Sequence, residues 1–214
     1  MAAKPTLPMR GHDGVNIQPS LAFSGEPLYV ATFWAAFVLW NASELFLNTK
    51  RRSAPADTRD RGSFRFLFLI LGVAFSLDFA FTLLLPAAAI TSATRSIFAL
   101  GICCVLTGTV LRWYAVATLG RYFTVNVATQ AAQPVIDAGP YRYIRHPAYA
   151  GSLLALIGFA LALGNWAGVL AMLILTGGAF GYRIAVEEAA LLSALGEPYA
   201  RYMRRTSRLI PYLV

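Results

Sequence analysis

The chain has 214 residues, of which 57% are hydrophobic and only 13% are charged, and its formal net charge is +8. Soluble domains carry about 25% charged residues, so this composition excludes an ordinary soluble protein and predicts an integral membrane protein. In a soluble chain, a pI near 9.9 would favour nucleic-acid binding. Here the basic residues sit at the ends of apolar segments, where they face anionic lipid, so we expect no nucleic-acid partner.

The apolar runs predict an all-α membrane protein with about five transmembrane helices. A bilayer core needs about 20 helical residues, so the first three runs are long enough to span, whereas the last two are short and form a helical hairpin. Asn165-Trp166 makes the polar turn of this hairpin, and Pro147 can begin its first arm. The runs are Leu28 to Leu47, Phe64 to Leu85, Ile97 to Leu119, Tyr149 to Leu163 and Trp166 to Tyr182.

One compact domain is the simplest organisation of these segments. Residues 1–26 are rich in Pro, Gly and polar groups and are expected to be a flexible exterior tail. Residues 27–119 hold three transmembrane helices. Residues 120–214 hold a cofactor-binding loop, the hairpin and C-terminal cytoplasmic helices, and the loop and last helix are expected to cap a cytoplasmic cofactor pocket.

The distribution of arginine predicts the orientation. Six basic residues fill the first loop, while the second loop has none before Arg95. The positive-inside rule therefore puts the first loop in the cytoplasm and the amino terminus outside. The later basic residues then also face the cytoplasm, as in a prokaryotic inner membrane.

The sequence offers no metal site and no dinucleotide loop. It has two histidines and one adjacent cysteine pair, Cys103-Cys104, which cannot provide a ligand set with zinc spacing. The glycine-rich stretch 177–181 lies inside an apolar run, so it predicts close helix packing through small residues.

Two polar clusters mark a ligand site at the membrane surface. In the first, His146 precedes Pro147, so its imidazole lies at the positive end of a helix, a setting that suits an anionic ligand group. Tyr149 and Tyr141 lie close to the same turn. A simple interfacial belt of Tyr and Arg is the alternative interpretation.

The second cluster is Arg183 with Glu187 and Glu188 at the end of the return arm. Arg183 and Glu187 are four residues apart, so they either form a helical ion pair or bind two oppositely charged ligand groups, a carboxylate and an ammonium. Asp78 is an ionisable residue near the middle of the second helix, and such residues are usually paired or functional. Arg112 is its candidate partner.

The order of these motifs resembles the isoprenylcysteine carboxyl methyltransferase family. It comprises Gly-Pro-Tyr, then Arg-His-Pro-x-Tyr-x-Gly, an Asn-Trp turn, Arg-x3-Glu-Glu and Gly-x2-Tyr-x2-Tyr, followed by a tail at 208–211. The resemblance covers the chain from about Gly120 onward, and the first three helices match only in character.

The resemblance implies a membrane methyltransferase that uses S-adenosyl-L-methionine. It implies that Arg183 holds the substrate carboxylate and is the catalytic residue, while the role of Glu188 stays open. The cofactor-binding residues that it implies are Gln133, Pro134, Val135, Ile136, Tyr141, His146, Pro147, Ala148, Tyr149 and Glu187. Many relatives have His at the position of Gln133.

The methyl acceptor is expected to be lipophilic, with the carboxylate of a prenylcysteine-like substrate favoured. An ionised carboxylate needs no general base, whereas Arg183 would be a poor clamp for a lipid amine or thiol. Sterol-type NADPH reductases share similar last helices and are the alternative enzyme class. This chain has Ala148 and Ser152 where those reductases carry Asn and Glu. A non-catalytic membrane adaptor is the third class.

Overall fold

The computed structural model describes residues 26–50, 62–123 and 134–211 and is almost entirely helical in these ranges. The predicted exterior tail, residues 1–26, lies almost wholly outside them. The α-helices are α1 (Pro27–Lys50), α2 (Ser63–Leu84), α3 (Thr94–Leu119), α4 (Pro147–Leu163), α5 (Trp166–Leu195) and α6 (Glu197–Arg205). Short 3-10 turns are η2 (Pro86–Ala88), η3 (Gly120–Tyr122) and η4 (Gly139–Arg142).

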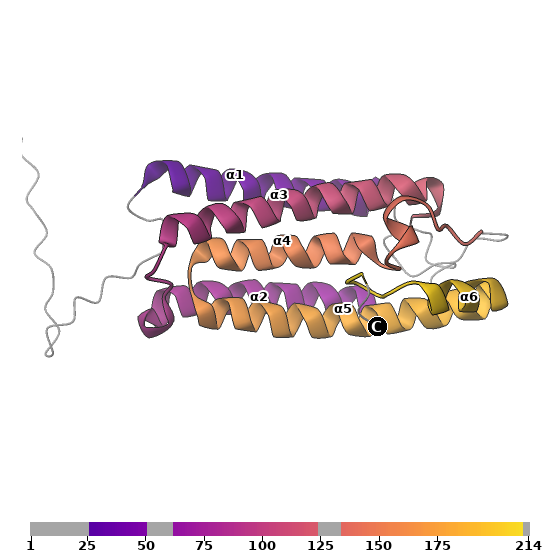
Figure 1. Ribbon diagram of the computed structural model, residues 1–214. Coiled ribbons are helices and arrows are strands. Elements are labelled where there is room, and N and C mark those ends of the chain that lie inside the picture. The colour runs from indigo at the N-terminus through magenta and orange to yellow at the C-terminus, as the bar shows by residue number, and fades with distance from the viewer. Residues whose placement is uncertain (1–25, 51–61, 124–133, 212–214) are drawn as a thin grey trace, which may run out of the picture.

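The prediction of an all-α membrane protein is confirmed. Among the described residues, four helices are long and apolar enough to cross a membrane: α1, α2, α3 with η3, and α5. The fifth, α4, has 17 residues and is therefore about 26 Å long, close to the thickness of a hydrocarbon core of about 30 Å. It lies between the α1 and α3 pair and the α2 and α5 pair (Figure 1).

Glycines fix how α3 packs on α4. A Cβ at Gly101 would lie 2.6 Å from the Gly158 carbonyl oxygen, and one at Gly151 would lie 2.5 Å from the Gly108 carbonyl oxygen. Both helices thus carry a glycine pair seven residues apart, and the two backbones touch at both levels. Such close approach is how small residues join membrane helices, and it sets the antiparallel register of α3 and α4.

The hairpin turn at Asn165 is present and joins three helices. Gly164, at φ 80°, ends α4 in the left-handed conformation that glycine favours. The Asn165 side-chain oxygen accepts from the backbone nitrogens of Ala167 and Gly168 at the start of α5. Its amide nitrogen donates to Phe81 O and Leu85 O, both at 3.0 Å, and so binds the end of α2.

α5 extends well beyond the apolar run that ends at Tyr182. It continues to Leu195, because Arg183 and Glu188, which follow the run, are buried in the interior and do not interrupt the helix. In the stretch 177–181, the prediction of close packing is wrong for the glycines, whereas Ala179 and Phe180 are each 3% exposed. A Cβ at Gly177, Gly178 or Gly181 would meet nothing within 4 Å, so these glycines line an open face.

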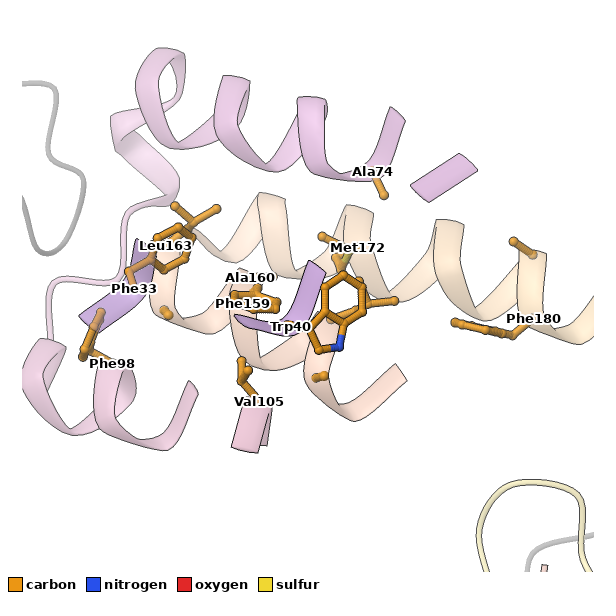
Figure 2. Packing of buried hydrophobic residues seen from close by; sticks show 14 of the residues in the cluster. Phe33, Trp40, Ala74, Phe98, Val105, Phe159, Ala160, Leu163, Met172 and Phe180 are labelled. Carbon is orange, nitrogen blue, oxygen red and sulfur yellow. The ribbon is translucent and has the colours of Figure 1, made fainter. Parts of the chain in front are cut away.

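Aromatic rings fill the space between α1, α2 and α4. Phe33, Trp40 and Phe159 are buried, and Phe159 is 0% exposed (Figure 2). Burying rings of this size provides much of the apolar area that holds a helix bundle together. Of these three rings, Trp40 also lines the cavity described next.

Candidate active site

One cavity of about 370 Å³ joins the two predicted polar clusters. All six α-helices contribute residues to it, and so do η3, η4 and the segment before η4. The predicted site residues that line it are Pro134, Val135, Ile136, Tyr141, His146, Ala148, Tyr149, Arg183 and Glu187. Gln133 lies outside the described residues. Pro147 is buried and begins α4 but does not line the cavity.

The loop that carries Tyr141 is fixed by η4 and by α6. Gly139, at φ 54°, and Pro140 start the turn, and Tyr141 is only 6% exposed. The Tyr202 hydroxyl on α6 donates to Tyr141 O at 2.7 Å. Burial raises the pKa of the phenols of Tyr141 and Tyr202, so both stay protonated at neutral pH.

Tyr149 connects the two charged residues of α5. Arg183 Nε donates to Tyr149 Oη at 2.9 Å, and that hydroxyl donates to Glu187 Oε2 at 2.7 Å. The Tyr149 phenol, which comes from α4, thus joins the two side chains through its hydroxyl.

Arg183 is held in a defined orientation. Arg183 is 2% exposed. Its Nη1 donates to Ser63 Oγ at 2.9 Å, and its Cζ lies 5.6 Å from the ring centroid of Phe64. A buried guanidinium presents its planar fork in one direction. The first turn of α2 thus helps to orient a residue of α5.

Glu188 is the anchor of the carboxyl-terminal segment. It is 5% exposed and accepts from Arg145 Nε at 2.8 Å and from Arg208 Nε at 3.1 Å. Its Oε1 also lies 3.3 Å from His146 Nε2. The structure thus gives Glu188, whose role had stayed open, an anchoring position: it ties the His146 turn to the segment after α6.

Further hydrogen bonds join the His146 turn to the segment after α6. Arg145 N donates to Ser207 O at 2.8 Å, and His146 N donates to Arg208 O at 3.0 Å. Arg145 Nη1 donates to Met203 O at 2.9 Å and also to Thr206 O. The segment after α6 therefore lies along the turn that begins α4.

The predicted pairing of Asp78 with Arg112 is wrong. Arg112 forms an ion pair with Glu44 on α1, with Nη2 at 2.6 Å from Oε2, and its Nη1 donates to Ala148 O at 3.3 Å. Asp78 is 0% exposed and packs against Gly168, and neither carboxylate oxygen has a hydrogen-bond partner among the described residues. The glycine register of α3 on α4 places Arg112 beside the start of α4, away from Asp78.

Several residues of the site were not predicted from the sequence. Tyr199 and Tyr202 line the cavity and were seen only as part of a motif, and Arg145 was not assigned a role. Glu44 and Trp40 of α1 also line it. In the sequence, Glu44 is a carboxylate within an apolar run, and this was the one indication of these two residues. A carboxylate at such a place usually has a charged or polar partner.

The residues present can hold a zwitterionic cofactor with an aromatic base. Glu187 supplies an anionic oxygen for an ammonium group, and the N-terminus of α4 beside His146 suits a carboxylate. Aromatic side chains from η4 and α6 provide flat apolar surface. Within the described ranges, no group of three or more His, Cys, Asp or Glu side chains could hold a metal ion.

The fold and the site together define the class of protein. It is a membrane-embedded protein whose helix bundle encloses a buried polar centre with apolar walls, and such a site suits an amphipathic ligand. Residues 99–193 match the model of the isoprenylcysteine carboxyl methyltransferase family. The resemblance to this family that was drawn from the sequence motifs is confirmed over these residues. The match begins within α3 and covers α4 and most of α5.

Named relatives agree with this assignment. The chain is 32% identical over 117 residues to protein-S-isoprenylcysteine O-methyltransferase of Schizosaccharomyces pombe, covering 54% of this chain and 49% of that protein. It is 29% identical over 115 residues to protein-S-isoprenylcysteine O-methyltransferase B of Arabidopsis thaliana, covering 53% of this chain and 58% of that protein. The chain thus spans about half the length of these relatives.

A solved structure has the same arrangement of helices. It is a eukaryotic intramembrane Ras methyltransferase, isoprenylcysteine carboxyl methyltransferase, with a TM-score of 0.58 and 29% sequence identity. The match covers 68% of this chain and 52% of that chain.

Proposed function

We propose that this protein is a membrane methyltransferase that moves a methyl group from S-adenosyl-L-methionine to the carboxylate of a lipophilic, prenylcysteine-like acceptor. The observation that carries the proposal is the cavity in which Arg183, Tyr149 and Glu187 meet an apolar wall. An acceptor with a carboxylate and a long apolar tail matches that combination. The names of the relatives support the same acceptor class.

The cofactor would be held by the part of the cavity nearest α6. Glu187 would bind its ammonium group, and Tyr141, His146, Ala148 and Tyr149 would line its place together with Pro134, Val135 and Ile136. S-adenosyl-L-methionine supplies an electrophilic methyl group on a sulfonium centre. Every other requirement of the reaction falls on the side chains of the protein.

Arg183 would orient the acceptor carboxylate. Such a carboxylate is ionised at neutral pH, so no side chain has to remove a proton from it. Arg183 is itself fixed by Tyr149 and Ser63, so the bound carboxylate has few orientations, and alignment of the reacting groups lowers the barrier. The apolar walls limit hydration of the nucleophile, which raises its reactivity.

The localisation follows from charge. The basic loop before α2 and the arginines after α5 would face the cytoplasm, and with them the cavity, as in a prokaryotic inner membrane. A green fluorescent protein fused after Val214 should then fluoresce in cells, since it folds poorly when exported. A dark fusion at normal expression would contradict this orientation.

Calorimetric titration of the detergent-purified protein with S-adenosylhomocysteine tests the cofactor assignment. We expect saturable binding that Glu187→Ala reduces at least tenfold without a change in melting temperature. NADPH is the control ligand. Binding of NADPH in place of S-adenosylhomocysteine would move the chain to the reductases, and binding of neither would favour a non-catalytic membrane adaptor.

Methyl transfer to N-acetyl-S-farnesylcysteine tests the role of Arg183. Arg183→Ala should retain S-adenosylhomocysteine binding and lose turnover at least hundredfold. Because Arg183 is buried, Arg183→Lys serves as a second variant that keeps the charge and removes the planar fork. Full turnover in Arg183→Lys would contradict a clamp that depends on bidentate geometry.

A further inference from the structure

Glu44 of α1 and Arg112 of α3 form an ion pair in the wall of the cavity. Arg112 Nη2 lies 2.6 Å from Glu44 Oε2, and Arg112 Nε lies against Glu44 Oε1. The side chains of Glu44 and Arg112 are 16% and 11% exposed, and both residues line the cavity. Glu44 lies before residue 99, so the family match does not reach it. Neither residue has a role in the proposed reaction.

This ion pair lies close to the place proposed for the cofactor. Arg112 Nη1 donates to Ala148 O at 3.3 Å, in the first turn of α4. Gly151 allows this approach, because a Cβ there would lie 2.7 Å from Arg112 N. Burial raises the pKa of Tyr141, the negative charge of Glu187 raises it further, and the positive charge of Arg112 opposes that rise. Arg112 therefore acts on the same phenol as Glu187, the residue proposed to hold the cofactor.

The charges around the cavity balance only when Glu44 is ionised. Three arginines and two glutamates line the cavity. A further carboxylate, Glu188, lies behind the lining and accepts from Arg145 Nε at 2.8 Å. Glu44 is the carboxylate that offsets Arg112, and its replacement by a neutral side chain leaves one positive charge in excess.

The two forms of the proposed cofactor differ in charge at the sulfur atom. S-adenosyl-L-methionine carries a sulfonium, whereas S-adenosylhomocysteine, which remains after methyl transfer, carries a neutral thioether. The acceptor carboxylate becomes a neutral ester in the same step, so the total charge is conserved. A cavity of about 370 Å³ is on the order of 10 Å across, and at that distance a unit charge in an effective dielectric of about 20 changes the affinity for a sulfonium roughly tenfold.

We infer that Glu44, by offsetting the charge of Arg112, sets the preference of the cavity for the sulfonium form of the cofactor over its neutral product. This inference rests on the proposed function for the identity of the cofactor. It deepens that function by giving a residue of α1 control over which form of the cofactor stays bound. Without the Glu44 carboxylate, the excess positive charge repels the sulfonium, whereas S-adenosylhomocysteine, a zwitterion without net charge, is little affected.

Calorimetric titration with both forms of the cofactor tests this preference without turnover. The full-length, detergent-purified protein and its Glu44→Gln variant are titrated with S-adenosyl-L-methionine and, separately, with S-adenosylhomocysteine, in the absence of acceptor. Glu44→Gln should weaken the binding of S-adenosyl-L-methionine roughly tenfold more than that of S-adenosylhomocysteine. A residue that only supports the fold would weaken both by the same factor, and that result overturns the inference.

Two further variants separate charge from structural support. Arg112→Gln leaves the Glu44 carboxylate in excess and should shift the ratio of the two affinities in the opposite direction, toward S-adenosyl-L-methionine. The double variant Glu44→Gln with Arg112→Gln restores neutrality and should return the ratio to within about twofold of that of the unaltered protein. It holds no unpaired buried charge, so it keeps the test valid if either single variant is unstable. A shifted ratio in the double variant overturns the inference.

Glu26→Gln is the matched control. Glu26 directly precedes α1 and pairs with Arg95 of α3 at 3.4 Å, so this ion pair also connects the first helix to α3. It is exposed, lies at the opposite end of α1 from Glu44, and does not line the cavity. Glu26→Gln should leave both affinities unchanged. Melting temperatures identify any variant that does not fold.

The outcomes separate this inference from the proposed function. If the unaltered protein binds both forms of the cofactor and Glu44→Gln weakens both equally, the inference is overturned and the proposed function stands. A selective loss of affinity for S-adenosyl-L-methionine supports both. Binding of neither form by the unaltered protein overturns the proposed function and this inference with it.

Discussion

Tyr149 Oη lies 2.9 Å from Arg183 Nε, although the two residues are 34 positions apart in the sequence. The phenol comes from α4 and the guanidinium from α5, so the contact forms only when the hairpin closes. The same hydroxyl reaches Glu187 at 2.7 Å. One hydroxyl thus couples the residue proposed to hold the acceptor to the residue proposed to hold the cofactor.

Tyr149→Phe should therefore weaken both proposed functions of the site. It removes one hydrogen bond to each of two charged groups, and such bonds contribute about 1.5 to 3 kcal/mol. We expect turnover to fall at least tenfold and S-adenosylhomocysteine affinity to fall as well, measured by methyl transfer and calorimetry. Tyr182→Phe is the control, because Tyr182 is an exposed tyrosine of α5 that does not line the cavity. Loss of turnover with full cofactor affinity would restrict Tyr149 to the acceptor side.

Glu188→Gln should loosen the carboxyl-terminal segment. Glu188 accepts from Arg145 and Arg208, and the loss of its charge leaves the buried Arg145 without its anion. Removing one partner of a buried pair costs on the order of 3 kcal/mol. Hydrogen exchange of residues 203–210 should increase, and the melting temperature should fall.

Glu197→Gln is the matched control for this change. Glu197 is an exposed carboxylate that pairs with Arg204 at 2.7 Å on the surface of α6. Exposed ion pairs contribute about 0 to 1 kcal/mol, so this variant should melt within about 2 °C of the unaltered protein. Equal effects of the two substitutions would show that Glu188 does not anchor the segment.

Gly101→Ala should destabilise the bundle more than an ordinary helix substitution. An added Cβ would lie 2.6 Å from Gly158 O and 2.8 Å from Ala162 N, both backbone atoms that cannot rotate away. Forcing α3 and α4 apart costs about 1 to 3 kcal/mol. Gly177→Ala is the control, since its Cβ meets open space and Ala favours a helix. A Gly101→Ala protein as stable as the control would contradict backbone contact between these helices.

Asp78→Asn should leave the melting temperature unchanged or raise it. Asp78 is fully buried and has no hydrogen-bond partner among the described residues, so a charge there is costly. Glu44→Gln provides the contrast, because Glu44 has Arg112 as its partner, and its loss should cost on the order of 3 kcal/mol. A large loss of stability in Asp78→Asn would show that Asp78 binds a cation.

The motifs of the last two helices could be read from the sequence because they are local. Pro147 after His146, the capping Asn165 and the grouping of Arg183 with Glu187 and Glu188 each follow from positions a few residues apart. The helical hairpin and nine of the residues that line the cavity could therefore be named in advance. The end of α5 could not, because polar residues indicate a helix end only when they face water, and here they face a site.

Composition and the order of short motifs were enough to place this chain in the membrane and to indicate the family that it resembles. Tertiary structure alone decided which charges meet. Arg112 pairs with Glu44 and not with Asp78, because contact between glycine backbones sets the register of α3 on α4. It alone also brought Trp40 of α1, Phe75 of α2 and Phe159 of α4 into contact. Partners of this kind are far apart in sequence, and no local pattern encodes the register that brings them together.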